Sequence, residues 1–486
     1  MKRIYLVCGV SESYKLLYHI GCELERSFNV YPVYVYFLED AKKYLIKKGV
    51  PTEKLRRLHE GLVYGCWDQK PVDMDYIKRM EKLYGIPNLW LIWETIRNHE
   101  KNHTYYNALK LLESVFRHYE DFVSKENIDA VLTHVYPSTI PSYIFFNVLK
   151  RKGIQTYIFI AHRLSGRFVV FNGFTDSGFI DKYEKVDKAF ESIQKRDLTK
   201  EEFELAVDFM ETFREKKAFR IQDKIIFGRK SVSVKRLKNF LKQLYLDYSL
   251  KLYRNLRWNS PFSPIIWTKK RLMTIPRKYF LLHAKLFQNP DYGEKYVLCL
   301  LMKQPEASTL AKAPYHLDQI QFVHNVSKSL PVDYRLYVKP HFNDFGNHSY
   351  KYFKLMSQRP NIKMLSVYSN NHELVKNCSL VITINGTVGW EGLIFDKPVI
   401  TFGNVFYNSF PLVEKVKDIK QLPQVIRGML DNYKPDRELL YKYIIANYKG
   451  SHEGTPIVPL LDKKLSIDPQ NIKKITSGLA HEIGLR

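Results

Sequence analysis

The sequence predicts an α/β fold in which two Rossmann-type units are separated by a strongly basic segment. Three observations lead to this prediction. Strand-like apolar runs alternate with helix-like segments near the start of the chain, the same alternation returns late in the chain, and the stretch between them differs in composition. Such alternation is typical of open parallel sheets, whose binding sites lie at the carboxyl ends of the strands.

The first unit is predicted from four short runs of apolar and β-branched residues. Segments with apolar residues at helical spacing lie between them, for example 14–26 and 140–152. We expect residues 1–200 to form this N-terminal Rossmann-like domain. The predicted strands are 4–10, 30–37, 130–134 and 156–161.

The second unit repeats the pattern within residues 291–435. A helical tail is expected to follow it at 436–486. The predicted strands of the second unit are 296–302, 335–338, 362–365, 380–384 and 399–402.

The segment between the units, residues 201–290, is expected to be largely helical. Its stretch 214–285 holds 20 Lys or Arg and three acids, with aromatic residues interleaved. A solvated helical linker and a helix on an anionic membrane surface both fit this pattern. Nucleic acid is a weaker alternative and is not expected as a partner, because no RNA- or DNA-binding signature accompanies the charge.

The composition limits the class of protein. The chain has 486 residues, 45% of them hydrophobic, and a net charge of +26, so it can bury sizeable cores and attract polyanions. Its five cysteines form no C-x-x-C pair, so neither a disulfide framework nor a zinc site is expected. No uninterrupted apolar stretch approaches the length of a membrane span. We expect a cytoplasmic protein, soluble or held at a membrane surface.

The most informative motif joins a strand to a helix. The turn Asn385-Gly386-Thr387 follows an apolar run, and the next helix bears Glu391. N–H groups at a helix start bind phosphate, Gly386 and Gly389 let the backbone approach a ligand, and the Asn and Thr side chains add donors. Glu391 is expected to face the same ligand and to accept from sugar hydroxyls. For N-G-T alone, a simple turn with a helix cap is the alternative.

Two further polar groups follow predicted strands of the second unit. The first group places four polar residues within six positions, and a surface turn explains so many polar residues poorly. The second group combines a lysine with a histidine, and these side chains can bind a phosphate. A solvated loop is the alternative for the second group. The residues are Gln304, Glu306, Ser308 and Thr309, and then Lys339 and His341.

The first unit also offers polar residues after its strands. Histidine and arginine side chains there are expected to line one cleft, because arginine forks suit carboxylates and phosphates. For each of these side chains, a purely structural role is as well supported as a role in binding a ligand. The residues are His134, His162, Arg163 and Arg167.

Together these motifs resemble the signature of the bacterial capsule polysaccharide biosynthesis proteins, the family that contains the Kdo transferases of capsule assembly. The matching segments are KQPEAST from Lys303, NGTVGWEGL from Asn385 and KPVITFG from Lys397. The resemblance covers 296–407 well and the N-terminal half only in layout. One departure is Lys339-Pro-His-Phe, which replaces the family's usual Lys-Glu-His-Pro and retains the histidine.

The resemblance implies a GT-B-like fold of two Rossmann-type domains that face across a cleft. It implies a glycosyltransferase that uses a nucleotide-sugar, in several members a CMP-activated ulosonic acid such as Kdo. Residues 1–200 would lie on the acceptor side and 291–435 on the donor side. The acceptor would be a surface or capsular glycan, presented on a lipid carrier at the inner face of the membrane. Beyond the donor itself, no cofactor and no metal ion are implied.

The motifs and the resemblance assign roles to these residues. The catalytic candidates are Glu306, Gln304 and His341, with Glu306 nearest the anomeric centre. The donor-binding candidates are Ser308, Thr309, Lys339, Asn385, Gly386, Thr387 and Glu391. The substrate-binding candidates are His134, His162, Arg163 and Arg167. Two other functions stay open: a non-catalytic scaffold that binds polyanions or membranes, and a transferase that uses UDP- or GDP-sugars.

Overall fold

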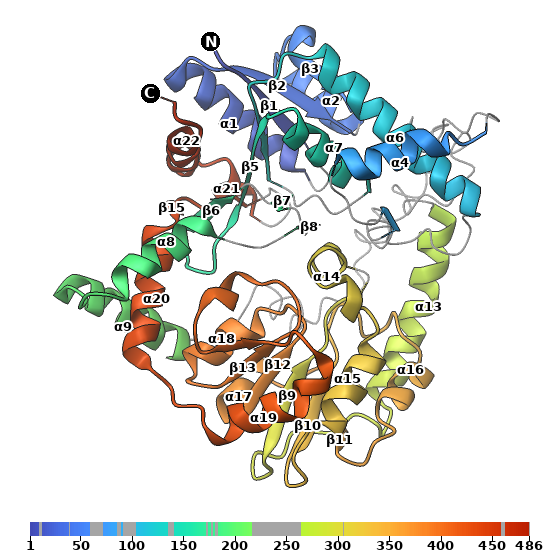
Figure 1. Ribbon diagram of the computed structural model, residues 1–486, viewed down its shortest axis with the longest axis vertical. Coiled ribbons are helices and arrows are strands. Elements are labelled where there is room, and N and C mark those ends of the chain that lie inside the picture. The colour runs from blue at the N-terminus through green and yellow to red at the C-terminus, as the bar shows by residue number, and fades with distance from the viewer. Residues whose placement is uncertain are drawn as a thin grey trace. The chain divides into compact units, whose positions relative to one another are not determined.

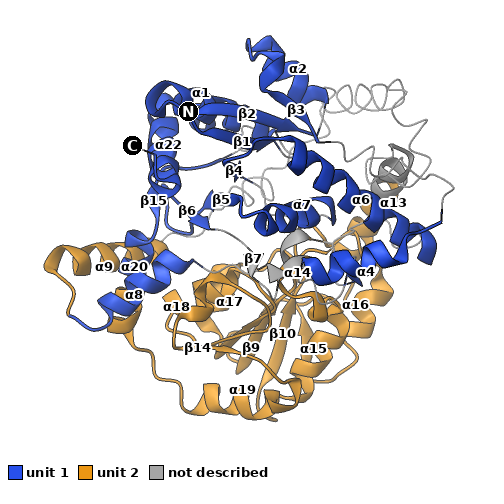
Figure 2. Cartoon of the chain, turned by 45° about the horizontal axis from the view of Figure 1, so that its top comes forward, with its two compact units in different colours: residues 1–96, 100–196, 444–486 blue, residues 97–99, 197–443 orange. Residues whose placement is uncertain are grey.

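The structure is a computed structural model, and Figure 1 shows its elements. It describes residues 1–8, 12–37, 39–58, 71–84, 89–90, 104–134, 140–171, 174–175, 178–179, 183–215, 264–304, 306–457 and 462–485. The chain divides into two units (Figure 2). Unit 1 comprises residues 1–96, 100–196 and 444–486, and unit 2 comprises residues 97–99 and 197–443.

Unit 1 is built on a seven-stranded sheet with the order β15-β6-β5-β4-β1-β2-β3. The five strands from β5 to β3 pair in parallel, whereas β6 and β15 join antiparallel at one edge. The four predicted strands are confirmed as β1, β2, β4 and β5. The strands are β1 (Arg3–Cys8), β2 (Tyr31–Tyr36), β3 (Leu55–Arg57), β4 (Ala130–Thr133), β5 (Gln155–Ala161), β6 (Arg167–Phe171) and β15 (His452–Glu453), and β7 (Phe174–Thr175) pairs with β8 (Gly178–Phe179).

The helices of unit 1 bury their apolar sides against this sheet. Helices α1 and α22 contribute Leu16, Ile20 and Leu479, among others, to one continuous core with β1 and β2. Helix α22 starts with an Asp468 cap and Pro469 in its first turn, a favourable helix start. The helices are α1 (Ser13–Phe28), α2 (Glu39–Lys47), η1 (Thr52–Lys54), α4 (Met74–Leu83), α6 (Tyr105–Lys125), α7 (Ile140–Arg151), α8 (Glu184–Ile193), α21 (Lys463–Ser466) and α22 (Pro469–Ile483), and α20 (Arg437–Lys449) crosses from unit 2.

Unit 2 contains a six-stranded sheet with the order β11-β10-β9-β12-β13-β14, and every pairing in it is parallel. The five predicted strands are confirmed as β9 to β13. Strand β9 lies between β10 and β12, so the strand order reverses there. Ligands of open α/β sheets bind at such a switch point, beyond the carboxyl ends of the strands. The strands are β9 (Tyr296–Leu300), β10 (Arg335–Lys339), β11 (Ile362–Met364), β12 (Leu380–Thr383), β13 (Val399–Thr401) and β14 (Val413–Lys415).

Two Rossmann-type units in one chain are the components of a GT-B-like fold, as the resemblance implies. The core of unit 2 is formed by the inward residues of its strands and by Phe322, Phe353 and Ile426 of the surrounding helices. The helices are α9 (Lys200–Glu215), α13 (Pro264–Leu282), α14 (Ala307–Lys312), η2 (Pro314–His316), α15 (Gln319–Lys328), α16 (Tyr350–Met356), α17 (Asn371–Asn377), α18 (Val388–Ile394), η3 (Phe406–Ser409), η4 (Ile419–Gln421) and α19 (Leu422–Asp431).

The structure gives the place of the C-terminal residues and of the ends of the basic segment. Residues 444–486 pack within unit 1, whereas a helical tail was expected from 436 onward. Most of the basic segment, 216–263, lies outside the described residues, and helices α9 and α13 are its described ends. Within the described ranges, no helix combines the length and apolar character of a membrane span.

Candidate functional site

The candidate residues of unit 2 gather at the carboxyl edge of its sheet. The loops after β9, β10, β12 and β13 all start there, because these strands run parallel. A side chain on Gly386 would lie 3.3 Å from the Met302 sulfur, and one on Gly403 would lie 3.2 Å from Cβ of Asn385. The loops after β9, β12 and β13 are therefore in contact.

The turn after β12 is held by hydrogen bonds on both sides of Gly386. Its N–H donates to Oγ1 of Thr383 at 2.9 Å, and its carbonyl accepts from the Tyr407 hydroxyl. A Cβ on Gly389 would lie 2.7 Å from Cζ of Tyr407. The space beside Gly389 is thus filled by a tyrosine of this chain. This corrects the expectation that Gly389 lets the backbone approach a ligand.

Helix α18 begins just after this turn. Thr387 is its N-cap residue, half-buried, and its side chain makes no capping hydrogen bond. Asn385 and Glu391 are almost fully buried, with 8% and 6% of their surface exposed. Of the three side chains, Thr387 is therefore the most accessible to a phosphate at the helix start. The burial of Glu391 makes it a poor acceptor for sugar hydroxyls, contrary to our expectation.

The loop after β9 is anchored by Gln304. Its backbone N–H donates to Oδ2 of Asp344 at 3.1 Å, and its side-chain amide donates to the Leu317 carbonyl at 2.6 Å. Gln304 therefore holds the loop rather than presenting a free amide. Glu306 is the half-buried N-cap residue of α14, and its side chain makes no capping hydrogen bond.

Helix α14 carries the remaining two residues of this group. Ser308 lies in its first turn. The Thr309 hydroxyl is fully buried, and no hydrogen-bond partner for it lies among the described residues. Buried hydroxyls are nearly always paired, so the unpaired Thr309 hydroxyl is an exception within the part of the chain that the structure describes.

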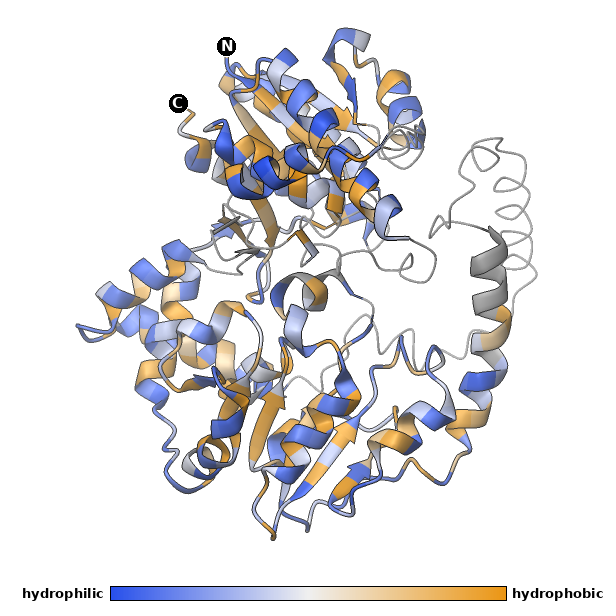
Figure 3. Ribbon diagram, turned by 45° about the vertical axis from the view of Figure 1, so that its right-hand side comes forward, coloured by the Kyte–Doolittle hydropathy of each residue, from blue (hydrophilic) through white to orange (hydrophobic). Residues whose placement is uncertain are grey.

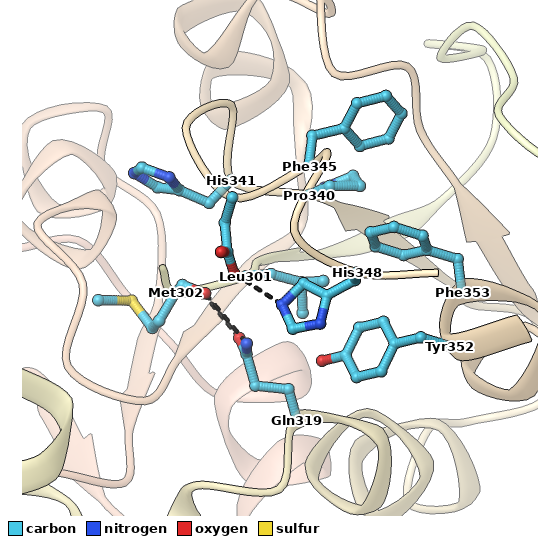
Figure 4. A pocket seen from close by; sticks show the side chains of 10 residues that line it. Leu301, Met302, Gln319, Pro340, His341, Phe345, His348, Tyr352 and Phe353 are labelled. Atoms are coloured by element: carbon cyan, nitrogen blue, oxygen red, sulfur yellow. Dashed lines mark hydrogen bonds and ion pairs between the residues drawn. The ribbon is translucent and has the colours of Figure 1, made fainter. Parts of the chain in front are cut away.

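The loop after β10 contains a buried aspartate that hydrogen bonds hold in place. Asp344 is 3% exposed and accepts from Nε2 of His348 and Nδ2 of Asn347, each at 2.8 Å. Burial acts to raise the pKa of Asp344, but the hydrogen bonds from His348 and Asn347 outweigh it and lower the pKa. Asp344 and His348 line a small cavity together with His341, and Figure 4 labels the two histidines. Asp344 is therefore an ionised, fixed group.

His341 lies within the field of this carboxylate and of two lysines. Burial lowers the pKa of His341, Asp344 opposes this effect, and Lys303 and Lys339 add to it. The buried Nδ1 of His341 lacks a hydrogen-bond partner within the described ranges. Lys339 is itself 93% buried, since 7% of its surface is exposed. A buried lysine thus ends strand β10, and a neutral histidine lies two positions after it.

The sequence analysis missed Asp344 and His348. Their spacing of four residues in HFNDFGNH is a visible signal, because residues four apart lie on one side of a helical turn. The loop has no regular helix, however, and the pairing of Asp344 with the Gln304 loop joins residues 40 positions apart. Only the fold brings these two loops together.

In unit 1, His162 is fully engaged. Its Nδ1 accepts from the Leu164 N–H at 3.0 Å, and its Nε2 donates to Oδ1 of Asn447 at 3.0 Å. Burial, aided by Arg163 and Arg167, lowers the pKa of His162 to about 3. His162 is therefore a neutral structural residue.

The other three candidates of unit 1 differ in accessibility. The Arg167 guanidinium donates to the Ser451 hydroxyl at 2.7 Å and to the Tyr448 carbonyl at 2.8 Å. Nδ1 of His134 donates to the Phe159 carbonyl at 3.0 Å, and burial lowers its pKa. Arg163 is exposed at the turn between β5 and β6. Only Arg163 presents its charge to solvent.

One group of side chains in the described ranges could share a metal ion. The ligating atoms of His452, His481 and Glu482 lie within 4.8 Å of one another. Glu482 Oε1 already accepts from Nε2 of His452 at 2.5 Å and pairs with Lys185 at 2.6 Å. An ammonium on the same oxygen competes with any cation, so we read the group as an ion-pair cluster.

Comparisons with known proteins locate the recognised segment in unit 2. Residues 316–423 match the family model described as capsule polysaccharide biosynthesis protein. Protein FixF of Sinorhizobium fredii is 40% identical over 91 residues, which are 17% of this chain and 22% of FixF. Capsule polysaccharide export protein KpsS of Escherichia coli is 24% identical over 184 residues, 36% of this chain and 44% of KpsS. The chain thus spans less than half the length of these relatives.

Solved structures show a weaker likeness. A KpsC β-Kdo 2,4-transferase of Thermosulfurimonas dismutans is 14% identical, covers 68% of this chain and 82% of its own, and has a TM-score of 0.33. The UDP complex of MnaA from S. aureus is 11% identical, covers 100% and 98%, and has a TM-score of 0.29. Likeness at this level supports no conclusion about function. The resemblance to the capsule family rests on residues 316–423.

Proposed function

We propose that this chain, whose residues 316–423 match the model of the capsule polysaccharide biosynthesis protein family, is a glycosyltransferase that extends a surface or capsular glycan. The proposal rests on two buried polar atoms that lack hydrogen-bond partners in the described part of the chain and lie at the sheet edge to which this segment contributes strands. Thr309 Oγ1 and His341 Nδ1 are buried at the carboxyl edge of the unit 2 sheet, each without a partner in the described ranges. A ligand with hydroxyl and phosphate oxygens would satisfy both.

The donor is a nucleotide-sugar, and the family resemblance favours CMP linked to an ulosonic acid such as Kdo. The helix start at Thr387 and the Lys339 ammonium supply positive charge for its phosphate. The neutral His341 donates or accepts one hydrogen bond there. Asn385, Gly386 and Ser308 complete the proposed donor contacts, whereas Glu391 and Gln304 act as positioning residues.

Glu306 is the proposed catalytic residue. In the transfer step, the acceptor hydroxyl forms a C–O bond to the anomeric carbon while the bond from that carbon to the phosphate oxygen breaks. The nucleotide leaves with the electron pair, and the acceptor proton passes to the Glu306 carboxylate. Lys339 stabilises the charge that develops on the leaving phosphate.

The acceptor is proposed to be a glycan on a lipid carrier, reached by a protein that sits peripherally on the inner face of the membrane. Arg163 and His134 of unit 1 stay as candidate acceptor contacts. His162 and Arg167 are left out, because both ring nitrogens of His162 and the guanidinium of Arg167 bind within unit 1, whereas the hydrogen bond described for His134 uses Nδ1 alone.

The proposal is tested by incubating the protein with CMP-Kdo and a panel of UDP- and GDP-sugars. We expect nucleotide release from one donor class in the wild type. Glu306→Gln should abolish release and leave the thermal shift caused by the nucleotide nearly unchanged, because the carboxylate acts mainly in the transition state. If no donor releases nucleotide and none shifts the melting temperature, the chain is the non-catalytic scaffold instead.

A further inference from the structure

The loop after β9 leads to Glu306, and two side chains from elsewhere in unit 2 hold its backbone. Gln319, the first residue of α15, accepts from the Met302 N–H at 2.7 Å and donates to the Met302 carbonyl at 3.0 Å. Figure 4 shows this amide facing Met302. Asp344 accepts from the Gln304 N–H at 3.1 Å. Two side chains that are distant in sequence therefore fix three backbone groups of this loop.

Both side chains are themselves held in place. Gln319 is 2% exposed, and Asp344 is buried as well. The carboxylate of Asp318 accepts from two backbone N–H groups at the start of α15, which fixes the direction from which Gln319 reaches the loop. Asp344 is bound on both oxygens, because Oδ2 also accepts from His348 and Oδ1 accepts from Asn347. We call Gln319 and Asp344 the loop clamp.

The loop clamp borders the apolar core of unit 2. Figure 3 shows hydrophobic residues along the strands of this unit. The core residues Leu301, Phe345 and Phe353 line the same small cavity as the two clamp side chains. A polar group that loses its hydrogen bond in such surroundings is costly, because little water can replace the lost partner. Removing either clamp side chain would therefore destabilise the position of this loop.

The clamp reaches Glu306 only through the backbone. Glu306 lies two positions after Gln304, and its side chain makes no capping hydrogen bond on α14. The backbone that leads to Glu306 therefore determines where its carboxylate lies. A displacement of about 1 Å at a catalytic group can lower turnover about 100-fold.

We propose that Gln319 and Asp344 are positioning residues that hold Glu306 in place by clamping the backbone of residues 302–304. This inference rests on the proposed function, in which the Glu306 carboxylate takes the proton of the acceptor. The clamp acts on the chemical step, so its loss lowers kcat.

Nucleotide binding depends less on the clamp. Helix α14, which carries the proposed donor contact Ser308, is tied to another loop, because the Lys312 carbonyl accepts from the Asn404 N–H at 3.1 Å. The helix start at Thr387 belongs to the loop after β12. These contacts stay in place when the clamp is lost.

The test compares kcat for nucleotide release with the calorimetric affinity for the nucleotide. Asp344→Asn keeps the size of the side chain but replaces an accepting oxygen by a donor, and Gln319→Met removes both hydrogen bonds to Met302. Each variant should lower kcat by about 100-fold. Each should change the dissociation constant of the nucleotide by less than about threefold. The kcat is expressed per site titrated with nucleotide, so unfolded molecules do not contribute.

Ser327→Ala is the matched control. The Ser327 hydroxyl donates to Oδ1 of Asn361 at 2.6 Å, and Ser327 is 2% exposed, so this change also breaks a buried hydrogen bond of unit 2. Asn361 precedes β11 and therefore lies at the opposite edge of the sheet from Glu306. The control should lower the melting temperature and keep the kcat of the wild type.

Amide hydrogen exchange of residues 302–304 measures the clamp without turnover. Both clamp variants should exchange this segment at least about tenfold faster than the wild type and Ser327→Ala do. The proposal is overturned if exchange is unchanged, if kcat is retained, if nucleotide affinity falls in step with kcat, or if Ser327→Ala loses kcat equally. If the wild type releases nucleotide from no donor, the proposed function fails, and exchange alone decides whether the clamp holds the loop.

Discussion

His341 and Lys339 differ in charge at the proposed phosphate site. Burial lowers the pKa of His341, so the imidazole is neutral near pH 7 and can form a hydrogen bond but carries no charge. The nearby positive charges belong to Lys303 and Lys339, and Lys339 precedes His341 by two positions. The sequence analysis listed His341 as a catalytic candidate and Lys339 as a donor-binding candidate, but it could not predict the burial of either, because burial cannot be read from two polar residues near the end of a strand.

His162 makes the stability of the protein depend on pH. Its folded pKa is about 3, well below the ordinary histidine pKa of about 6.5. The unfolded state therefore binds more protons between these values, and stability is lost as the pH falls from about 6.5 toward 3. We expect a loss of about 2 kcal/mol between pH 6.5 and pH 5 from this residue.

Chemical denaturation at several pH values measures this effect. His162→Gln should flatten the dependence of the unfolding free energy on pH in that window. His283→Gln, at an exposed position, is the control and should keep the slope of the wild type. An unchanged slope in His162→Gln would show that other groups cause the acid sensitivity.

At the scale of elements, the packing of α18 against Tyr407 depends on Gly389. A methyl group there would collide with the Tyr407 ring, since its Cβ would lie 2.7 Å from Cζ. We expect Gly389→Ala to destabilise the protein by about 1–3 kcal/mol. Adding Tyr407→Phe should recover part of this loss by removing the hydroxyl. Gly428→Ala, whose Cβ meets open space on α19, should be neutral or stabilising.

Thermal unfolding of these variants checks the prediction. Equal melting temperatures for Gly389→Ala and Gly428→Ala would mean that Tyr407 moves away at little cost, and the turn before α18 would then be open to a ligand on this side.

The elements themselves could be predicted from sequence to different extents. Strands β1, β2, β4, β5 and β9 to β13 follow from local apolar runs, because the strands of a parallel sheet covered by helices are buried on both faces, and even the edge strand β11 is buried. Strand β15 has only two residues, His452 and Glu453, and forms by antiparallel pairing with Phe168 and Arg167. No local periodicity encodes a pairing across about 280 positions, so β15 could not be predicted.

At the scale of the whole molecule, the C-terminal residues complete unit 1. Helix α22 places Ile472, Ile475 and Leu479 in the core beside α1. Deleting residues 469–486 should therefore expose a large apolar surface and give an insoluble or unfolded protein. Soluble yield and thermal unfolding measure this outcome. As a control, Lys473→Gln with Lys474→Gln removes charge from α22 and should leave the fold intact.

A deletion variant that melts like the full chain would show that α22 is a dispensable addition. The sequence analysis expected a helical tail at 436–486 and did not predict its packing in unit 1, because a long-range return of the chain leaves no mark in composition. The grouping of the candidate residues of unit 2 was easier to predict, since these residues lie at or after the ends of strands in one parallel sheet, whose carboxyl ends meet at one edge.

Calorimetric titration with CMP, UDP and GDP tests the central claim, that the carboxyl edge of the unit 2 sheet binds the nucleotide of a sugar donor. We predict that one nucleotide, CMP on the family resemblance, binds the wild type. Thr387→Ala and Lys339→Ala should each weaken it by about 10- to 150-fold, the cost of losing a hydrogen bond to a charged group. Arg163→Ala, in unit 1, should bind as the wild type does. The claim is contradicted if no nucleotide binds, or if folded Thr387→Ala and Lys339→Ala proteins retain wild-type affinity.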